Sequence, residues 1–383
     1  MKTALVLSGG GARGAYQVGV LKALCKALPA PSTPFSIITG VSVGALNAAV
    51  LASEAQDFHK GVEKLETIWR GLHCDSVYRT DSLAMATQLS RWALAGFFGW
   101  AGATPPRSLL DNSPLRTLLE KNVHFEQVNH HIETGVLEAI AITASSYDTN
   151  QAVTFYNSTH GIKPWTRARR ISASQAITAQ HVMASSALPL VFPAIPIDGA
   201  YYGDGALREN APLSAAIHLG CDQILTIGAR DIKIDLHEDD KKQDYPSVGD
   251  LAGQMLDIVF NDDADADRER LLRINQTLAL IPTAKRIEMG LRPIDLFSVH
   301  PTADIRQLAG QYAEDLPTSV RLLLRVLGAF KPPWVLPSYL AFEPGYISAL
   351  IDLGEKDGAN QAQLFVQTLT NTPSPSFQAN VSR

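Results

Sequence analysis

Two short, uncharged apolar runs near the start of the chain each end in a turn and each precede a helical pattern. The first run covers Thr3 to Ser8, and the second covers Phe35 to Thr39. Residues 15–28 and 45–54 follow them, the first with apolar residues on one helical stripe. A strand–turn–helix unit that occurs twice in succession indicates parallel strands joined by crossover helices. We therefore predict an α/β fold with a mainly parallel central sheet.

Later segments extend this pattern without a clear break. Further strands are predicted at residues 137–145, 153–157, 223–229 and 293–299, and further helices at residues 113–122, 211–219, 265–277 and 318–327. A chain of 383 residues could hold two or three domains of roughly 150 residues each. Because strand-like segments resume after a charged stretch at residues 230–250, we expect one α/β core over residues 1–230. Residues 231–383 are expected to form a C-terminal helical extension that partly packs back on the core, with a loose tail from about residue 371.

The composition excludes several classes of protein. Hydrophobic residues make up 46% and charged residues 19%, which is typical of a globular chain and excludes a disordered one. The formal net charge of −5 gives no basic field for general nucleic-acid binding, so no nucleic-acid partner is expected. Cys25, Cys74 and Cys221 are scattered, which argues against a disulfide framework or a zinc site. No metal and no cofactor are expected, and the sequence leaves the oligomeric state undetermined.

No segment has the pattern of a secretion signal or a membrane span. The apolar run at Ala4 to Leu7 is too short for a signal peptide, and no run reaches about 18 apolar residues. We expect a cytoplasmic protein, with or without peripheral contact to a membrane. Trp92 to Ala103 is the longest apolar stretch and suits either a buried helix or a flap at a lipid interface. Arg167, Arg169 and Arg170 form a basic cluster that suits a solvated face or anionic head groups.

A glycine-rich loop separates the first strand from the first helix. Its sequence, GGGARG at Gly9 to Gly14, matches the GxGxxG pattern of dinucleotide-binding proteins. The second strand of such a protein ends in an acidic residue that binds the ribose, whereas this one ends at Thr39 and Gly40. Nucleotide binding is therefore the less favoured alternative. Amides of such a loop at a helix N-terminus can instead hold a permanent anion or the transient oxyanion of acyl transfer. Arg13 either adds a positive charge there or lies on the surface.

The second turn carries a serine between two glycines. Its sequence is GVSVG, with Gly40 and Gly44 placed two residues before and after Ser42. A serine at a tight strand-to-helix turn needs small residues at these two positions, because larger ones would collide where strand and helix meet. The turn exposes the hydroxyl, and the amide of Val43 can contribute to an oxyanion hole. This pattern predicts that Ser42 is a nucleophile.

A nucleophilic serine needs a group that accepts its proton. The late histidines His218, His237 and His300 are candidates, but nothing in the residues around them marks any of the three. A carboxylate stands out instead, because Asp204 lies between two glycines in a tight loop, with Gly205 and Ala206 following it. The upstream segment ASSALPLVFP, residues 184–193, is rich in small residues and could form the wall of an acyl pocket.

In this order, GGGARG, GVSVG, ASSALPLVFP and DGA resemble the patatin-like phospholipase family over residues 4–230. The resemblance implies a three-layer α/β/α fold and a serine–aspartate dyad without histidine. By position, Ser42 would be the nucleophile and Asp204 the base. The oxyanion hole would be formed by the glycine loop and the residue after the serine, that is Gly9, Gly10, Gly11, Arg13, Gly14 and Val43. Ser8 stands where relatives often have Asp.

These patterns predict a lipid acyl hydrolase that cleaves a carboxylic ester through an acyl-serine intermediate, with a lipid or acyl ester as its substrate. The sequence does not choose the head group or the chain length. One alternative is a soluble acyl esterase or thioesterase with the same dyad. Another, less favoured, is a nucleotide-binding protein that uses the glycine loop. A relative that binds lipid without turning it over is a third alternative, against which the intact Ser42 and Asp204 argue.

Overall fold

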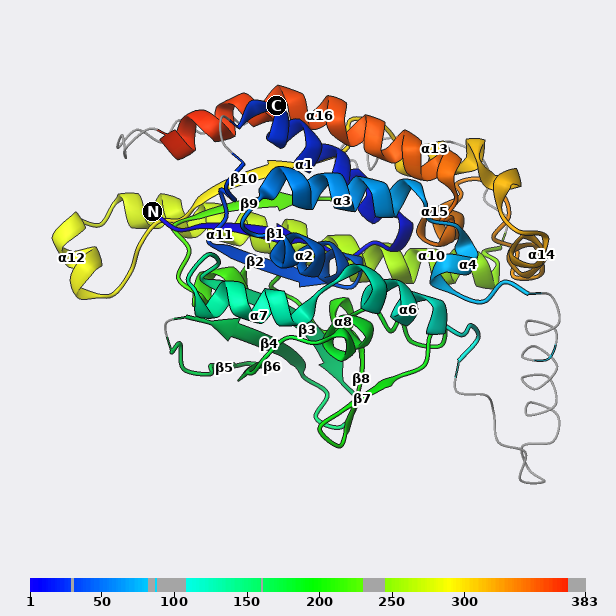
Figure 1. Cartoon of the computed structure of the whole chain (residues 1–383), viewed down its shortest axis with the longest axis horizontal. Helices are drawn as coiled ribbons and strands as arrows, with labels where there is room; N and C mark the ends of the chain where they lie inside the picture. The colour runs from blue at the N-terminus through cyan, green and yellow to red at the C-terminus, as the bar shows by residue number, and fades with distance from the viewer. Residues whose placement is uncertain (29–30, 82–86, 88–107, 160, 230–244, 371–383) are drawn as a thin grey trace.

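The computed structural model describes residues 1–28, 31–81, 87, 108–159, 161–229 and 245–370. Within them, a ten-stranded sheet has helices packed on both faces, which confirms the predicted three-layer α/β/α arrangement (Figure 1). The strands are β1 (Thr3–Leu7), β2 (Ile37–Val41), β3 (Ala139–Ser146), β4 (Ala152–Ser158), β5 (Thr166–Arg167), β6 (Arg170–Ser174), β7 (Ile195–Ile197), β8 (Ala200–Asp204), β9 (Gln223–Ile227) and β10 (Asp295–Val299).

The strand order is β10-β9-β1-β2-β3-β4-β6-β5, and β8 pairs with β3 and β7. From β10 to β3 every neighbouring pair is parallel, whereas β4 and β8 run antiparallel to β3. Each strand predicted from the sequence is present within a few residues of its predicted bounds. Strands β5 to β8 were not predicted. They are short, and their partly exposed residues lack the continuous apolar pattern of a buried strand.

The parallel strands are buried on both faces. Along β1, Leu5 and Leu7 point into the larger of two hydrophobic cores, and Ala4 and Val6 point into the smaller one. The larger core is covered by α1 (Ala15–Ala27), α2 (Val43–Ser53), α3 (Phe58–Arg70), α6 (Ser113–Asn122), α7 (Phe125–Glu133), α8 (Ala179–Ser185) and α16 (Pro344–Thr370). The smaller core is covered by α9 (Ser214–His218) and α11 (Asp263–Ala279). Strands that are buried on both faces explain the charge-free runs in the sequence.

The C-terminal half joins both the sheet and the helical layers. Strand β10 extends the sheet beside β9, and α16 lies along α1 (Figure 1). Two glycines allow this helix contact, because a Cβ on Gly19 would lie 2.0 Å from the carbonyl oxygen of Ile351, and a Cβ on Gly354 would lie 2.2 Å from that of Tyr16. The division into a core over residues 1–230 and a C-terminal extension over residues 231–383 stays a prediction.

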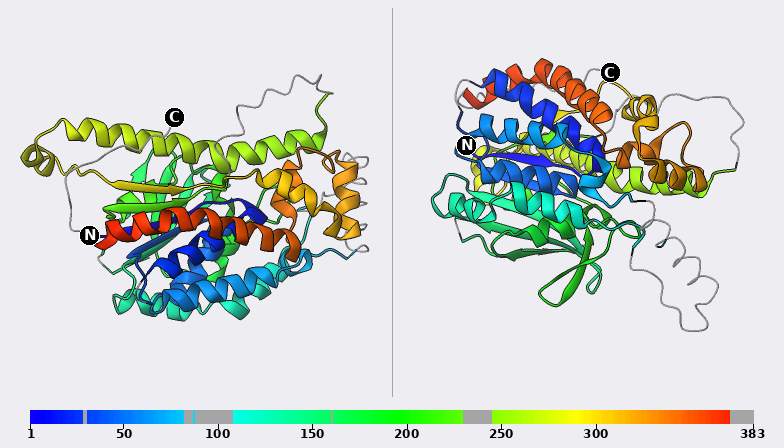
Figure 2. Two further views of the ribbon diagram at one scale, coloured as in Figure 1. Left: turned by 90° about the horizontal axis from the view of Figure 1, so that it is seen from above. Right: turned by 45° about the vertical axis from the view of Figure 1, so that its right-hand side comes forward.

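The remaining helices lie mostly in the C-terminal half. They are α4 (Cys74–Val77), α10 (Val248–Asp257), α12 (Thr283–Glu288), α13 (Ile305–Gln311), α14 (Thr318–Val326) and α15 (Val335–Leu340). The short 3-10 helices are η1 (Gly11–Gly14), η3 (Gly205–Leu207) and η6 (Ala313–Asp315), and η5 (Ile258–Asp262) is a π-helical turn. Helix α10, the π-helical turn η5 and α11 follow one another along one edge of the molecule (Figure 2). Among the helices in the described ranges, none combines the length and apolar character needed to span a bilayer.

Three sequence expectations fall outside the described residues. They concern the apolar stretch Trp92 to Ala103, the candidate base His237 and the tail from residue 371. Of the charged stretch at residues 230–250, only the part from Tyr245 onward is described.

Candidate active site

Ser42 occupies a sharp turn between β2 and α2. Its backbone has φ 54° and ψ −127°, a left-handed conformation that costs free energy for any residue other than glycine. The two flanking glycines are required by close contacts. A Cβ on Gly40 would lie 2.3 Å from the carbonyl oxygen of Gly44, and a Cβ on Gly44 would lie 2.1 Å from that of Leu7. The turn is therefore the strained strand-to-helix elbow that the GVSVG sequence predicts.

Asp204 lies directly against this serine. The Ser42 hydroxyl donates a hydrogen bond of 2.6 Å to Oδ2 of Asp204, whose other oxygen accepts one of 3.0 Å from the amide of Ala206. The carboxyl is 1% exposed. Burial raises the pKa of Asp204 to about 7, although the hydrogen bonds from Ser42 and Ala206 act in the opposite direction. A carboxylate with a pKa near neutrality is a better proton acceptor than an exposed aspartate.

Strand β8, which was not predicted, places Asp204 at the elbow. It pairs antiparallel with β3, so that Asp204 lies opposite Ala144 at the same end of the sheet as Ser42. The loop after it is as tightly packed as the elbow, since a Cβ on Gly205 would lie 2.1 Å from the carbonyl oxygen of Thr143. The hydroxyl of Ser145 donates to the carbonyl of Gly205 at 3.2 Å. Both neighbours that the sequence singled out, Gly205 and Ala206, thus hold the carboxylate in place.

The glycine loop packs beside the elbow. Gly10 and Gly11 have φ 152° and 55°, values that L-residues rarely adopt. Gly11 and Val43 line the same cavity as Ser42, and a Cβ on Gly9 would lie 3.1 Å from the Cβ of Ser42. Because Val43 is the first residue of α2, helix geometry leaves its amide without an intrahelical partner. The glycine loop and the start of α2 therefore lie beside Ser42 at the same cavity.

Two other residues of the predicted oxyanion hole have different surroundings. Gly14 is a packing position, because a Cβ there would lie 2.7 Å from a methyl group of Val43. The guanidinium of Arg13 is neither on the surface nor part of the cavity lining. It is 2% exposed and makes hydrogen bonds with Ser338 and Asp257 in the C-terminal half.

Ser185 holds the backbone of the elbow, and the sequence analysis did not single it out. The amide of Ser42 donates to Oγ of Ser185 at 2.8 Å, and that hydroxyl donates to the carbonyl oxygen of Thr143 at 2.6 Å. The segment ASSALPLVFP was predicted to wall a pocket, and Ser186, Leu188 and Phe192 do line the cavity. Nothing in the sequence distinguishes Ser185 from its neighbour Ser186, because the complete burial of Ser185 is visible only in the folded chain.

An apolar cavity opens at Ser42 and Asp204. It encloses about 670 Å³ of space between atoms, including its open mouth. Its lining is almost wholly aliphatic and aromatic: Gly11, Ser42, Val43, Leu46, Trp69, Leu72, Val77, Leu115, Leu118, Ser186, Leu188, Phe192, Asp204, Phe260, Tyr339, Leu340 and Phe342. We call this space the acyl cavity. Four of its residues, Phe260, Tyr339, Leu340 and Phe342, lie in residues 231–383, where the sequence analysis placed no residue of the dyad, the oxyanion hole or the pocket wall.

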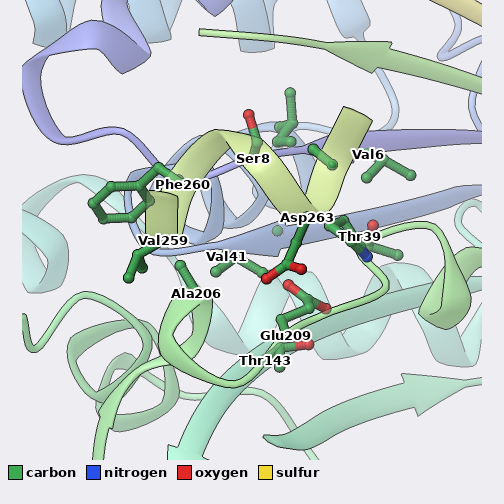
Figure 3. A pocket seen from close by; sticks show the side chains of 15 residues that line it. Val6, Ser8, Thr39, Val41, Thr143, Ala206, Glu209, Val259, Phe260 and Asp263 are labelled. Atoms are coloured by element: carbon green, nitrogen blue, oxygen red, sulfur yellow. The ribbon is translucent and has the colours of Figure 1, made fainter. Parts of the chain in front are cut away.

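A second, smaller cavity lies behind the elbow and the Asp204 loop (Figure 3). Glu209 and Asp263 point toward one another inside it. Burial raises the pKa of Glu209 to about 8, with a hydrogen bond to Thr143 acting in the opposite direction. The ring of Phe260 lines both cavities, so this side chain forms part of the wall between them.

In the part of the chain that the structure describes, neither His218 nor His300 lies beside Ser42. His218 stacks on Trp165 with ring centroids 4.9 Å apart, and its pKa is lowered by burial and by nearby Arg167 and Arg170. His300 lies beside Gly228. The residues that line the acyl cavity include no histidine. In the described ranges, no cluster of three or more His, Cys, Asp or Glu could hold a metal ion.

Comparison with known protein families agrees with the resemblance noted above. The patatin-like phospholipase model matches residues 5–217, which is more than half of the chain. The chain therefore belongs to the patatin-like phospholipase family. The matched region contains the elbow, the glycine loop and Asp204, and it ends before β9, α10 and α15.

One curated relative and several solved structures are similar to parts of the chain. The lysophospholipase nte1 of Aspergillus terreus is 39% identical over 93 residues, which are 23% of this chain and 6% of that relative. The chain thus matches only a small part of that protein's length. VipD from Legionella pneumophila aligns at 13% identity over 95% of this chain and 67% of its own, with a TM-score of 0.35. Human GIVD cytosolic phospholipase A2 aligns at 11% identity over 96% of this chain and 60% of its own, with a TM-score of 0.44. Scores this low carry no conclusion about activity.

Proposed function

We propose that the protein is a lipid acyl hydrolase that cleaves a carboxylic ester through an acyl-enzyme intermediate on Ser42. The observation that carries this proposal is the 2.6 Å hydrogen bond from the Ser42 hydroxyl to the buried carboxylate of Asp204 at the end of an apolar cavity. A nucleophile, a base and a place for an acyl chain therefore meet at one point. Membership of the patatin-like phospholipase family supports the same class of reaction.

Acylation would begin with attack of Ser42 Oγ on the ester carbonyl carbon. As the new C–O bond forms, the hydroxyl proton passes to Oδ2 of Asp204, and the carbonyl oxygen becomes an oxyanion. The amides of Gly10, Gly11 and Val43 would stabilise this charge, since the loop and the start of α2 lie beside the serine. The intermediate then collapses, the C–O bond to the leaving alcohol breaks, and the alcohol takes the proton from Asp204.

Deacylation would repeat these steps with water. Asp204 accepts a proton as the water oxygen attacks the acyl carbon, and returns it to Ser42 Oγ as the ester bond to the serine breaks. The base must be ionised at the start of both half-reactions. Burial raises the pKa of Asp204 to about 7, which makes the carboxylate a stronger base. The same shift lowers the fraction of the carboxylate that is ionised below pH 7.

The shape and lining of the acyl cavity support a long-chain acyl group. Its walls are Leu, Val, Phe, Trp and Tyr side chains, and Ser42 and Asp204 provide the reacting polar atoms. Each buried methylene of a bound chain contributes about 0.8 kcal/mol, so a fatty-acyl chain would be favoured over an acetyl group by several kcal/mol. The acyl group of a short ester would leave most of this apolar cavity unfilled, which argues against a soluble esterase for short esters.

The test is covalent labelling followed by intact-protein mass. Wild type, Ser42→Ala and Asp204→Asn are incubated with a long-chain alkyl fluorophosphonate and with its short-chain counterpart. We expect one adduct on wild type, none on Ser42→Ala and much slower labelling of Asp204→Asn, with the long-chain reagent faster. Labelling of Ser42→Ala at the wild-type rate would refute the nucleophile. Equal rates for both chain lengths would favour the short-ester alternative.

A further inference from the structure

Arg13 connects the glycine loop to residues very far away in the sequence. Its Nε and Nη2 donate hydrogen bonds of 3.0 and 2.7 Å to Oγ of Ser338, which is 325 residues later. Its Nη1 donates to Oδ1 of Asp257 at 3.0 Å. The guanidinium carbon also lies 3.7 Å from the centroid of the Tyr339 ring, within the range of a cation–π contact. We call these four residues the Arg13 clamp.

The partners of Arg13 are themselves held together. The hydroxyl of Tyr339 accepts from Nη1 of Arg13 at 3.0 Å and donates to Oδ1 of Asp257 at 2.6 Å. Ser338 has no exposed surface, and its hydroxyl donates to the carbonyl oxygen of Val335 within α15. Because a buried charge without its partners is strongly unfavourable, the clamp favours one arrangement of these segments.

Helix α15 and the turn η5, which follows Asp257, pack against the glycine loop at two of its residues. A Cβ on Gly11 would lie 2.4 Å from the carbonyl oxygen of Tyr339, and a Cβ on Gly9 would lie 2.5 Å from the ring of Phe260. The rings of Phe260 and Tyr339 are 5.4 Å apart. Glycines have many accessible backbone conformations, so a loop of three in succession needs outside support to keep its amides in one direction. Here that support comes from α15 and η5.

We propose that Arg13 is a positioning residue, which holds the glycine-loop amides toward Ser42 through Ser338, Asp257 and Tyr339 and does not act on the oxyanion with its own charge. The proposal rests on the proposed function, because it assigns the loop amides to the oxyanion hole. It also makes the oxyanion hole depend on residues 257–339, which lie beyond the family match that ends at residue 217.

Two roles of Arg13 make opposite predictions for distant substitutions. If the guanidinium charge itself stabilised the oxyanion, Arg13→Lys would keep much of the activity and Ser338→Ala would leave it unchanged. If Arg13 acts through the clamp, Ser338→Ala must lower the rate although it leaves the positive charge in place. Lysine cannot replace the guanidinium in the second case, because its ammonium lacks the planar fork that reaches Ser338 and Asp257 together.

The principal experiment therefore uses Ser338→Ala, since Ser338 does not line the acyl cavity. We would measure kcat and KM for a fatty-acyl ester, and the Ki of a trifluoromethyl ketone of the same chain length, which forms a tetrahedral adduct with the serine. We expect kcat to fall on the order of tenfold, the Ki to rise by a similar factor and KM to stay unchanged, because misdirected amides bind the tetrahedral state less well. Ser319→Ala is the control. Ser319 donates to the carbonyl oxygen of Thr80 at 2.7 Å in the same half of the chain, and its loss should change none of the three values.

Tyr339→Phe keeps the test decisive if Ser338→Ala folds poorly, and a double variant adds a check if Ser338→Ala folds. Tyr339→Phe preserves the ring over Arg13 and removes only the hydroxyl, and we expect the same pattern with a smaller loss. The double variant Arg13→Lys with Ser338→Ala should lose no more than Arg13→Lys alone, because both changes disrupt one clamp.

The proposal is overturned if folded Ser338→Ala and Tyr339→Phe keep wild-type kcat and Ki, even when their Tm values fall, because the clamp would then only stabilise the fold. Wild-type activity of Arg13→Lys would overturn it as well. Failure of the proposed function looks different, since wild type itself would then form no adduct and hydrolyse no ester.

Discussion

The candidate reacting atoms and part of the cavity wall beside them come from two regions with very different sequences. Residues 8–44, together with the loop at Asp204, carry the elbow, the glycine loop and the candidate base, and glycines mark each of them. Residues 257–342 carry Phe260, Tyr339, Leu340 and Phe342, which form part of the wall of the acyl cavity and belong to no motif. Backbone geometry restricts the first region to a few residue types, whereas the second must only fill space with apolar groups.

This contrast predicts different outcomes for substitutions of similar size in the two regions. Changes in the first region should alter the chemical step or prevent folding, because backbone contacts there leave no room for an added atom. Changes in the second should alter which substrates fit, because side chains there can be shortened without moving the reacting atoms. The four predictions below test this division.

The largest effect is expected for Gly44→Ala. The added Cβ would lie 2.1 Å from the carbonyl oxygen of Leu7, so that either the elbow or β1 has to move. We expect fluorophosphonate labelling to fall below detection, in protein that is also much less stable. Gly61→Ala in α3 is the matched control, since its Cβ would lie 3.3 Å from that of Glu54, a contact that needs only a small shift to relieve. It should label normally and change stability by no more than about 1 kcal/mol. Normal labelling of Gly44→Ala would contradict the strained elbow.

Asp204→Asn should have the next largest effect, on the rate and on its dependence on pH. Removing a general base lowers the rate by about 10²- to 10⁴-fold. Because burial raises the pKa of Asp204 to about 7 and the base must be ionised, kcat/KM of wild type should rise tenfold per pH unit below 7 and level off above it. A wild-type profile that is flat between pH 5 and pH 8, with folded protein throughout, would show that another group is the base.

The same substitution should stabilise the fold above neutral pH. In the unfolded chain an aspartate has a pKa of about 3.9, so between that value and about 7 the folded state binds more protons than the unfolded one. The stability of wild type therefore declines as pH rises through this interval, whereas Asp204→Asn has no proton to lose. We expect the Tm of Asp204→Asn to exceed that of wild type at pH 8 and the difference to shrink toward pH 4. Equal Tm values of wild type and Asp204→Asn at pH 8 would show that ionisation of the buried carboxylate does not lower the stability of the fold.

Much of the fold followed from the sequence, because parallel strands buried on both faces leave uncharged apolar runs. Strands β1, β2, β3, β4, β9 and β10 lie where those runs predicted them. Strand β8 could not be found in this way, since its residues are partly exposed and its place depends on antiparallel pairing with β3. The sequence nevertheless identified Asp204, because its two glycine neighbours reflect close packing in the folded chain.

The walls of the acyl cavity could not be predicted for a different reason. Phe260, Leu340 and Phe342 are apolar residues of the hydrophobic core, and nothing in the sequence distinguishes them from other core residues. Arg13 is a second case in which the sequence did not predict the surroundings of a residue. Its place in the glycine loop suggested a charge near the oxyanion, but the partners that turn its guanidinium away lie 244 and 325 residues later. Long-range pairing of this kind leaves no local pattern.

The smallest effect is expected for Phe342→Ala, and it concerns selectivity. Phe342 lines the acyl cavity, with its ring centroid 6.3 Å from those of Trp69 and of Tyr78. Shortening it enlarges the cavity beside Trp69 and Tyr78 and leaves both side chains of the dyad unchanged, so we expect a long acyl chain to lose packing contacts and a short one to lose none. We expect labelling by a long-chain fluorophosphonate to slow about tenfold and labelling by a short-chain one to change less than twofold. A loss shared equally by both reagents would instead place Phe342 among the residues that support the chemical step.

Phe330→Ala separates this loss of packing from general destabilisation of the C-terminal half. Phe330 packs edge-to-face on Trp334 at 5.4 Å and lies under Arg325, outside the acyl cavity. Its removal should lower the Tm without changing the ratio of long-chain to short-chain labelling. If Phe330→Ala changed this ratio as much as Phe342→Ala does, selectivity would depend on the stability of the whole C-terminal half. If only Phe342→Ala changes it, substrate choice resides in the walls of the cavity, where single side chains can vary without touching the dyad.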